Sequence, residues 1–392
     1  MGFQKLPPIQ SMKNRLHSPI TNRGALAARP LTSWSALLAG VFLLAGPATQ
    51  AAPRTWSGGG GDNNWSTAAN WGGTAPAACD SLIFAGSTRV TNFNDLTALN
   101  LTGISFQNSG FSFGGNSVTN RGGIYDHAGN NTNNLPMYLS GGQGITNAAS
   151  GTVLQLGGIQ TNLASGNVLT FGGAGNIYVA GVISGIATVN ANGDGNGNGF
   201  LRLSAANTFT GPLTINSGTL QLGNAAAIPG GAGKGDVTNN ATIDLNGNSP
   251  TINGLFGSSS AVVDNTTGTA TCTLTVGNSA TNTGGVFEFD GTIQNSSGSV
   301  ALTKVNTNVF YLGGSGQYSG PTIINAGCLV LTNGASLDNS ASFNIAAGAQ
   351  FNYVNGSFSL GSSQTLTAGR TTNNGAADLV GDFDDRGTII VY

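Results

Sequence analysis

The stretch "TFTGPLTINSGTLQLGN" (Thr208–Asn224) decides the fold class of this chain. Its last part alternates apolar and polar residues, so Leu220 and Leu222 share one face of an extended segment while Gln221 lies on the other. Gly and Asn interrupt the alternation where tight turns are expected. A weaker copy, "QYSGPTIINAGCLVLTN" (Gln317–Asn333), aligns with it without a gap. The pattern therefore predicts a repeated strand-and-turn structure.

Shorter offsets predict how the strands stack. "NATIDLNGN" follows "GTLQLGN" closely and places Ile243 on Leu220 and Asp244 on Gln221. "GTVLQLGG" (151–158) and "GNVLTFGG" (166–173) are another pair with a short offset. Such offsets are typical of one coil of a parallel β-helix, in which each coil covers the inward apolar row of its neighbour. We expect an all-β, right-handed parallel β-helix or β-solenoid, with corner Asn side chains bonded to one another.

Composition and charge exclude several classes of protein. Only 7% of the 392 residues are charged, whereas 63 are Gly. The abundance of β-branched residues argues against disorder, and the thinly charged body has no basic footprint for nucleic acid. Three cysteines match no metal-ligand or disulfide spacing. Alternation predicts that Cys272 points inward and Cys328 outward.

The amino-terminal segment has the features of a secretory signal peptide. The apolar run in "SALLAGVFLLAGPATQAAP" is preceded by basic residues and is too short to span a bilayer. Thr49 and Ala51 suit the −3 and −1 positions of a cleavage site, and translation starts at Met1 or Met12. We expect a signal peptide at 1–51, a Trp-rich β cap region at 52–125 and a β-solenoid at 126–392.

The repeated phrase resembles the autotransporter-associated β-strand repeat of large exported bacterial proteins. The resemblance is carried by residues 203–224 and, with Gly316, Gln317 and Cys328 departing from the pattern, by residues 312–333. The opening "TWSGGGGDNNWSTAANW" is also similar to the start of such proteins. The resemblance implies a β-helical, passenger-like region that is secreted or held at the outer surface of a Gram-negative cell. It implies no catalytic residue.

Two groups of acidic residues are candidate sites. Asp194, Asn196 and Asn198 match the first half of a calcium loop, but Ala205 stands where that loop requires an acid. Glu288 and Asp290 share the outward face of a strand, and Asp382 and Asp384 lie in the densest charge cluster. Paired carboxylates could act as acid and base on a polysaccharide. Solvated turns and strand faces account for the same residues without chemistry.

Trp56, Trp65 and Trp71 gather near the start of the mature chain. They predict either an aromatic platform for sugar rings or a cap over the open apolar end of the first coil.

We expect a monomeric, exported, non-enzymatic structural or adhesive module without a cofactor and without a transmembrane helix in the mature chain. Its partners would be extracellular glycans or surface proteins. The alternatives are a polysaccharide lyase or hydrolase and a carbohydrate-binding module.

Overall fold

A computed structural model describes residues 51–391 except 163–166, 187, 280–284, 355–357, 361–363, 369–378, 381–382 and 386–387. The described residues belong to one compact unit, Thr49–Tyr392. Residues 1–50, where the signal peptide is expected, lie outside the described residues.

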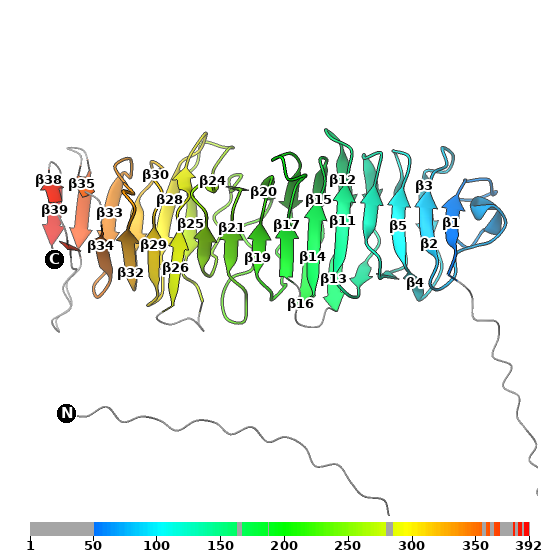
Figure 1. Cartoon of the computed structure of the whole chain (residues 1–392), viewed down its shortest axis with the longest axis horizontal. Helices are drawn as coiled ribbons and strands as arrows, with labels where there is room; N and C mark the ends of the chain where they lie inside the picture. Colours follow the sequence, from blue (N-terminus) through cyan, green and yellow to red (C-terminus); the bar gives the residue numbers. More distant parts are fainter. Residues whose placement is uncertain are drawn as a thin grey trace, which may run out of the picture. The chain divides into compact units, whose positions relative to one another are not determined.

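This unit is a parallel β-solenoid, seen as a row of stacked coils in Figure 1, and its sheets cover three faces. Consecutive strands lie on successive faces, and neighbouring strands of a sheet are parallel and one coil apart. Within the described ranges, sheet A has 15 strands, sheet B 11, sheet C five, sheet D six and sheet E two. This confirms the predicted all-β solenoid.

Sheet A contains β1 (Pro53–Trp56), β2 (Ser81–Phe84), β5 (Gly103–Phe106), β8 (Ile124–Asp126), β11 (Gln143–Asn147), β14 (Val168–Gly172), β17 (Thr188–Ala191), β19 (Leu213–Ile215), β21 (Val237–Asn239), β23 (Leu255–Gly257), β26 (Val286–Phe289), β29 (Val309–Leu312), β32 (Cys328–Leu331), β34 (Gln350–Tyr353) and β37 (Leu379–Val380). Sheet B contains β3 (Thr91–Asn94), β6 (Ser112–Gly115), β9 (Asn131–Asn133), β12 (Val153–Leu156), β15 (Asn176–Val179), β18 (Phe200–Leu203), β20 (Thr219–Leu222), β22 (Thr242–Asp244), β24 (Val262–Asp264), β27 (Thr292–Gln294) and β30 (Gly316–Gln317).

Sheet C contains β4 (Leu99–Leu101), β7 (Val118–Asn120), β10 (Met137–Leu139), β13 (Ile159–Asn162) and β16 (Ile183–Ile186). Sheet D contains β25 (Cys272–Val276), β28 (Val300–Lys304), β31 (Thr322–Ile324), β33 (Ser342–Ile345), β36 (Thr365–Ala368) and β39 (Thr388–Val391). Sheet E contains β35 (Phe358–Leu360) and β38 (Phe383–Asp385), and the single 3-10 helix among the described residues is η1 (Ala68–Trp71).

The third face carries sheet C in the coils up to β16 and sheet D in the coils from β25 onward. Between these two sheets it has no regular strands among the described residues. Main-chain N–H groups of Thr208 and Thr210 donate to the carbonyls of Ile183 and Gly185 in β16, at 2.9 and 3.1 Å. Further along, Ile252 N donates to Thr275 O of β25 at 2.9 Å. These bonds satisfy main-chain polar groups of the coil where the turn sequence interrupts the ladder.

Alternating burial puts the core inside the coils. Leu220 is fully buried, and it pairs in register with Ile243 of β22, while Gln221 pairs with Asp244. The offset between "GTLQLGN" and "NATIDLNGN" is therefore one coil, as the sequence predicts. Leu220 and Ile243 lie one strand spacing apart, about 4.8 Å, so a coil completes its apolar core only when the next coil covers it.

The offset between the phrases at 151–158 and 166–173 is not one coil, contrary to expectation. "GTVLQLGG" contributes β12 to sheet B, whereas "GNVLTFGG" contributes β14 to sheet A. The strand stacked on β12 is β15, whose Asn176 pairs with Val153. Two similar phrases therefore lie on different faces, because every face requires the same inward apolar alternation.

The longer offset, between the two copies of the repeated phrase, shows the same effect. "TLQL" of the first copy is β20 in sheet B, but the matching "CLVL" of the second copy is β32 in sheet A. The offset is therefore not a whole number of coils. The repeat encodes a local sequence of strand, corner and strand that any face accepts.

One side-chain prediction is wrong and another is confirmed in part. Cys328 was expected outside but is buried, because the outward side of β32 is also covered; Asn352 Nδ2 donates to its Sγ at 3.4 Å. Asn side chains of neighbouring coils do bond one another where Asn216 Nδ2 donates to Asn192 Oδ1 at 2.9 Å, but corner Asn side chains more often bond main-chain carbonyls of a neighbouring coil, as Asn239 Nδ2 does with Val262 O at 2.9 Å. An amide reaches a carbonyl across the corner because the polypeptide backbone passes there in every coil.

Candidate functional site

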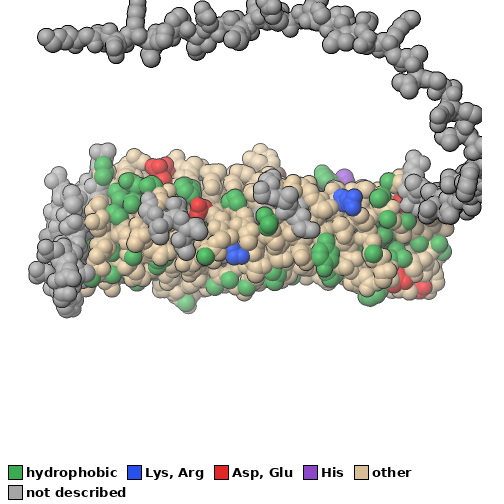
Figure 2. All heavy atoms as spheres, turned by 90° about the horizontal axis from the view of Figure 1, so that it is seen from below, with side chains coloured by type: hydrophobic (Ala, Val, Ile, Leu, Met, Phe, Trp, Pro, Cys, Tyr) green, Lys and Arg blue, Asp and Glu red, His purple; other side chains and the backbone are tan. Residues whose placement is uncertain are grey.

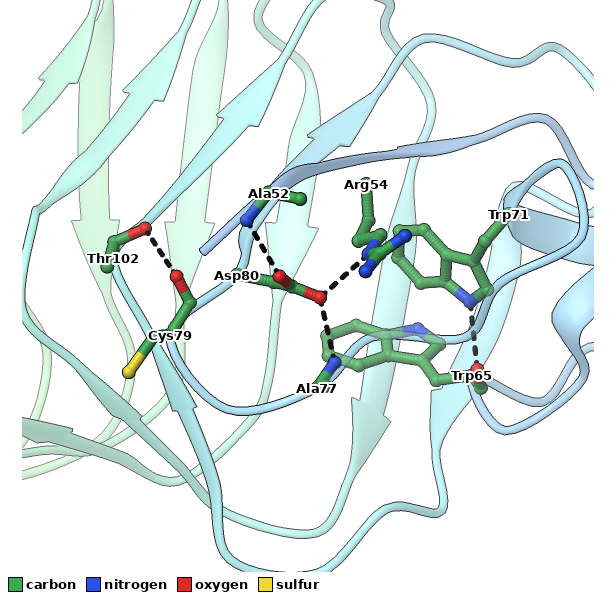
Figure 3. A network of polar contacts seen from close by, with 8 residues as sticks. All are labelled: Ala52, Arg54, Trp65, Trp71, Ala77, Cys79, Asp80 and Thr102. Carbon is green, nitrogen blue, oxygen red and sulfur yellow. Dashed lines mark hydrogen bonds and ion pairs between the residues drawn. The ribbon is translucent and has the colours of Figure 1, made fainter. Parts of the chain in front are cut away.

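Trp56, Trp65 and Trp71 form a buried cluster, of which Figure 3 shows Trp65 and Trp71. Trp56 and Trp65 are fully buried and Trp71 is 5% exposed. Trp71 packs edge-to-face on both of the others, with ring centroids 5.0 and 5.9 Å apart. Its indole N–H donates to Trp65 O at 2.8 Å, and that of Trp65 donates to Asn92 Oδ1 at 2.7 Å. Because their rings contact protein, this arrangement offers no platform for a sugar ring.

The segment that matches the first half of a calcium loop, Asp194–Asn198, forms a turn whose polar groups bond one another. Asp194 Oδ1 accepts from the main-chain N–H of Asn196 at 2.8 Å and of Asn198 at 3.1 Å, and Oδ2 accepts from Asn198 Nδ2 at 2.8 Å. The side-chain hydrogen bond from Asn198 lowers the pKa of Asp194. The loop itself satisfies the carboxylate, and within the described part of the chain no three His, Cys, Asp or Glu side chains gather for a metal ion.

Two of the four carboxylates of the enzyme alternative, Glu288 and Asp290, have side chains that the structure describes. Glu288 is exposed beside the buried Phe287 and Phe289, as the alternation predicts. Asp290 accepts a hydrogen bond from Asn333 Nδ2 at 3.3 Å, which ties the end of β26 to the end of β32, two coils further along sheet A.

The second part of that alternative lies beyond what the structure describes. Asp382 is outside the described residues. Asp384 belongs to β38, which pairs with β35 in sheet E. These positions therefore remain sequence predictions.

Sequence reasoning missed a set of buried corner carboxylates that clamp one coil to the next. Asp244 Oδ2 accepts from Thr266 Oγ1 at 2.8 Å, and Asp264 Oδ2 accepts from Ser296 Oγ at 2.6 Å. Both aspartates are buried and close their strands, β22 and β24, in register. A strand-final Asp that recurs in successive coils is the sequence signal that could have identified the clamps.

Ion pairing is sparse in this solenoid. Figure 2 shows few charged side chains on the face that it draws. Among the described residues, one ion pair is present, in which Arg54 Nε lies 2.7 Å from Asp80 Oδ2. The described helices include none that is long and apolar enough to cross a bilayer.

A shallow uncharged groove of about 430 Å³ runs across the outer face of sheet A. Hydroxyl side chains, among them Ser105 and Thr146, line it together with a column of glycines. Tyr125 is 43% exposed at this groove, and its ring centroid lies 4.3 Å from that of His127. The groove therefore combines an aromatic ring with hydroxyl groups and contains no charge.

The floor of the groove is open because side chains are missing from it. Gly144 has an ordinary backbone conformation, and a Cβ built on it meets no atom within 4 Å. The backbone at this position does not require glycine, so a larger residue would fit the fold and fill the groove.

The passenger-associated-transport-repeat family matches residues 196–222 and 302–331. These matches coincide with the two copies of the repeated phrase. The chain is also similar to the adhesin BmaC autotransporter of Brucella suis biovar 1 (strain 1330), with 30% identity over 135 residues. That alignment covers 34% of this chain and only 4% of the relative. No solved structure matches this chain.

Proposed function

We propose that this solenoid, which carries two autotransporter passenger repeats, acts outside the cell as a non-enzymatic adhesive module. The observation that carries the proposal is the coincidence of those repeats with a parallel β-solenoid, together with the similarity to an autotransporter adhesin. A stack of coils presents similar polar surfaces many times along its length, and many weak contacts add to a strong attachment.

We assign the groove on sheet A to neutral glycans. Sugar rings stack on aromatic side chains, and their hydroxyl groups exchange hydrogen bonds with Ser and Thr. The absence of charged side chains from the lining favours a neutral sugar over an acidic one. Tyr125 would supply the stacking face, and the glycine column would let the ring approach the sheet.

Adhesion of the purified solenoid to host cells and to arrays of neutral and acidic glycans tests both parts. Tyr125→Ala and Gly144→Val should each reduce binding at least tenfold, because one removes the stacking ring and the other fills the groove. Gly114→Val is the matched control, since Gly114 in β6 also has an ordinary backbone and open space around it but lies in sheet B.

The outcomes are distinct. If both groove variants still adhere to cells, the groove is not the glycan-binding site, and the proposed adhesive function is unaffected. Failure of the unmodified protein to adhere to any cell or glycan would refute the module. Release of reducing or unsaturated sugar ends would instead support the polysaccharide-active alternative.

A further inference from the structure

The residue that would begin the mature chain makes a specific contact with a buried carboxylate (Figure 3). Ala52 N donates to Asp80 Oδ1 at 2.9 Å, across 28 residues of sequence. Ala52 O in turn accepts from Ser81 N at 3.2 Å, at the start of β2. The first residue after the expected cleavage point is therefore held from both its nitrogen and its oxygen.

The carboxylate that receives Ala52 is built into the first coil. Asp80 is only 1% exposed, in the loop that precedes β2. Its other oxygen, Oδ2, accepts from Arg54 Nε at 2.7 Å and from Ala77 N at 2.9 Å. Oδ1 faces Ala52, so one oxygen joins the loop to β1 and the other accepts the Ala52 N–H.

We propose that Asp80 is the acceptor for the new amino terminus, so that cleavage between Ala51 and Ala52 converts a hydrogen bond into an ion pair that locks the first coil. A signal peptidase would hydrolyse the Ala51–Ala52 peptide bond with water. The hydroxyl of the water goes to the Ala51 carbonyl, which leaves with the leader as a carboxylate. The Ala52 nitrogen takes up the protons and becomes an α-ammonium group.

The position fits this chemistry on both sides of the bond. Thr49 and Ala51 are the small residues that such a peptidase requires, and Ala51 is exposed. Ala52 is half-buried and already within hydrogen-bond distance of the acceptor, so no rearrangement is needed after cleavage. A charged donor to a carboxylate makes a shorter and stronger bond than an amide donor does.

Few other groups compete for this pairing. The titratable side chains of β1 and of the loop between η1 and β2 are Arg54, Cys79 and Asp80, and neither β2 nor β5 has any. Pairing with Asp80 raises the pKa of the α-ammonium above its ordinary value of about 8. The ion pair therefore contributes stability below that ordinary value, and the contribution is lost as pH rises through the raised pKa.

The test compares solenoids that begin at Ala52 with solenoids that keep Gln50 and Ala51, since Thr49–Tyr392 forms one compact unit. Removable tags leave these termini, and Asp80→Asn is made in both. Hydrogen exchange of peptides from β1 and β2 reports local opening at pH 6. Acetylation of the α-amino group across pH 6–11 reports its pKa.

We expect β1 and β2 of the Ala52 chain to exchange about fivefold more slowly than those of the longer chain, and Asp80→Asn to abolish the difference. The α-amino pKa should be raised in the chain with Asp80 and should return to its ordinary value of about 8 in the Asp80→Asn chain. Equal exchange in the two chains, or an ordinary α-amino pKa with Asp80 present, would overturn the proposal. Mass spectrometry of the exported full-length chain should place the mature amino terminus at Ala52. A terminus at any other residue would also overturn the proposal.

Discussion

Replacing Trp65 with alanine should unfold the N-terminal coils and leave the distant coils intact. Trp65 is fully buried and packs on Trp71, Phe84 and Phe113 with ring centroids 5.4 to 5.9 Å apart. Truncating a buried Trp costs about 3–5 kcal/mol, and the change also removes the donor to Asn92 Oδ1. We expect a loss of about 4 kcal/mol, since the cavity lies at the end of the stack and can admit water to Asn92.

Hydrogen exchange measured by mass spectrometry localises this loss. A cost of about 4 kcal/mol corresponds to about a thousandfold faster exchange, and in a solenoid it should be confined to the coils that contact the cavity. Peptides from β1 to β6 should therefore exchange faster, while those from β26 to β32 should not change. Trp65→Phe is the control: it keeps a ring but loses the N–H, at a cost of about 1–2 kcal/mol.

Two results would refute this reasoning. An equal increase of exchange along the whole solenoid would show that the coils do not unfold locally. Normal exchange in β1 to β6 combined with lost glycan binding would show that Trp65 serves a ligand and not the coil end.

Three further variants test the buried ionisable groups. Asp264→Ala should lower the free energy of unfolding, measured by urea denaturation at pH 7, by about 3 kcal/mol, because the bonds from Ser296 to the carboxylate are lost. Burial alone would raise the pKa of Asp264, but its hydrogen bonds lower it. The difference in unfolding free energy between wild type and variant should therefore shrink as pH falls below about 4. Burial lowers the pKa of Lys304 to about 8, so the unfolded chain binds more protons than the folded chain between pH 8 and 10.5. The unfolding free energy of wild type should therefore rise over this range by about 3 kcal/mol relative to that of Lys304→Met. Parallel plots of unfolding free energy against pH for the two proteins would contradict this. Burial also raises the pKa of Asp126, whose Oδ2 has no partner among the described atoms. Asp126→Asn introduces the residue that β11 has at the paired position, Asn147, and should raise the melting temperature. A lower melting temperature would show that the charge of Asp126 is needed.

Local alternation was enough to predict the class of fold and part of its register. Leu220 over Ile243 follows from the short offset between two similar phrases, since inward positions of stacked coils must both be apolar. The outward position of Glu288 follows from the same rule. Both are properties of neighbouring residues and of a repeated pattern, which a sequence displays directly.

Only the tertiary structure shows on which face of the coil each of the repeated sequence phrases lies. Three faces of a coil impose the same inward pattern, so "TLQL" in sheet B and "CLVL" in sheet A look equivalent in sequence. Alternation also fails to show what covers an outward side chain, which is why the burial of Cys328 and Asp264 was missed. The contact of Ala52 with Asp80 depends on a loop returning across 28 residues, and no local pattern encodes such a distance.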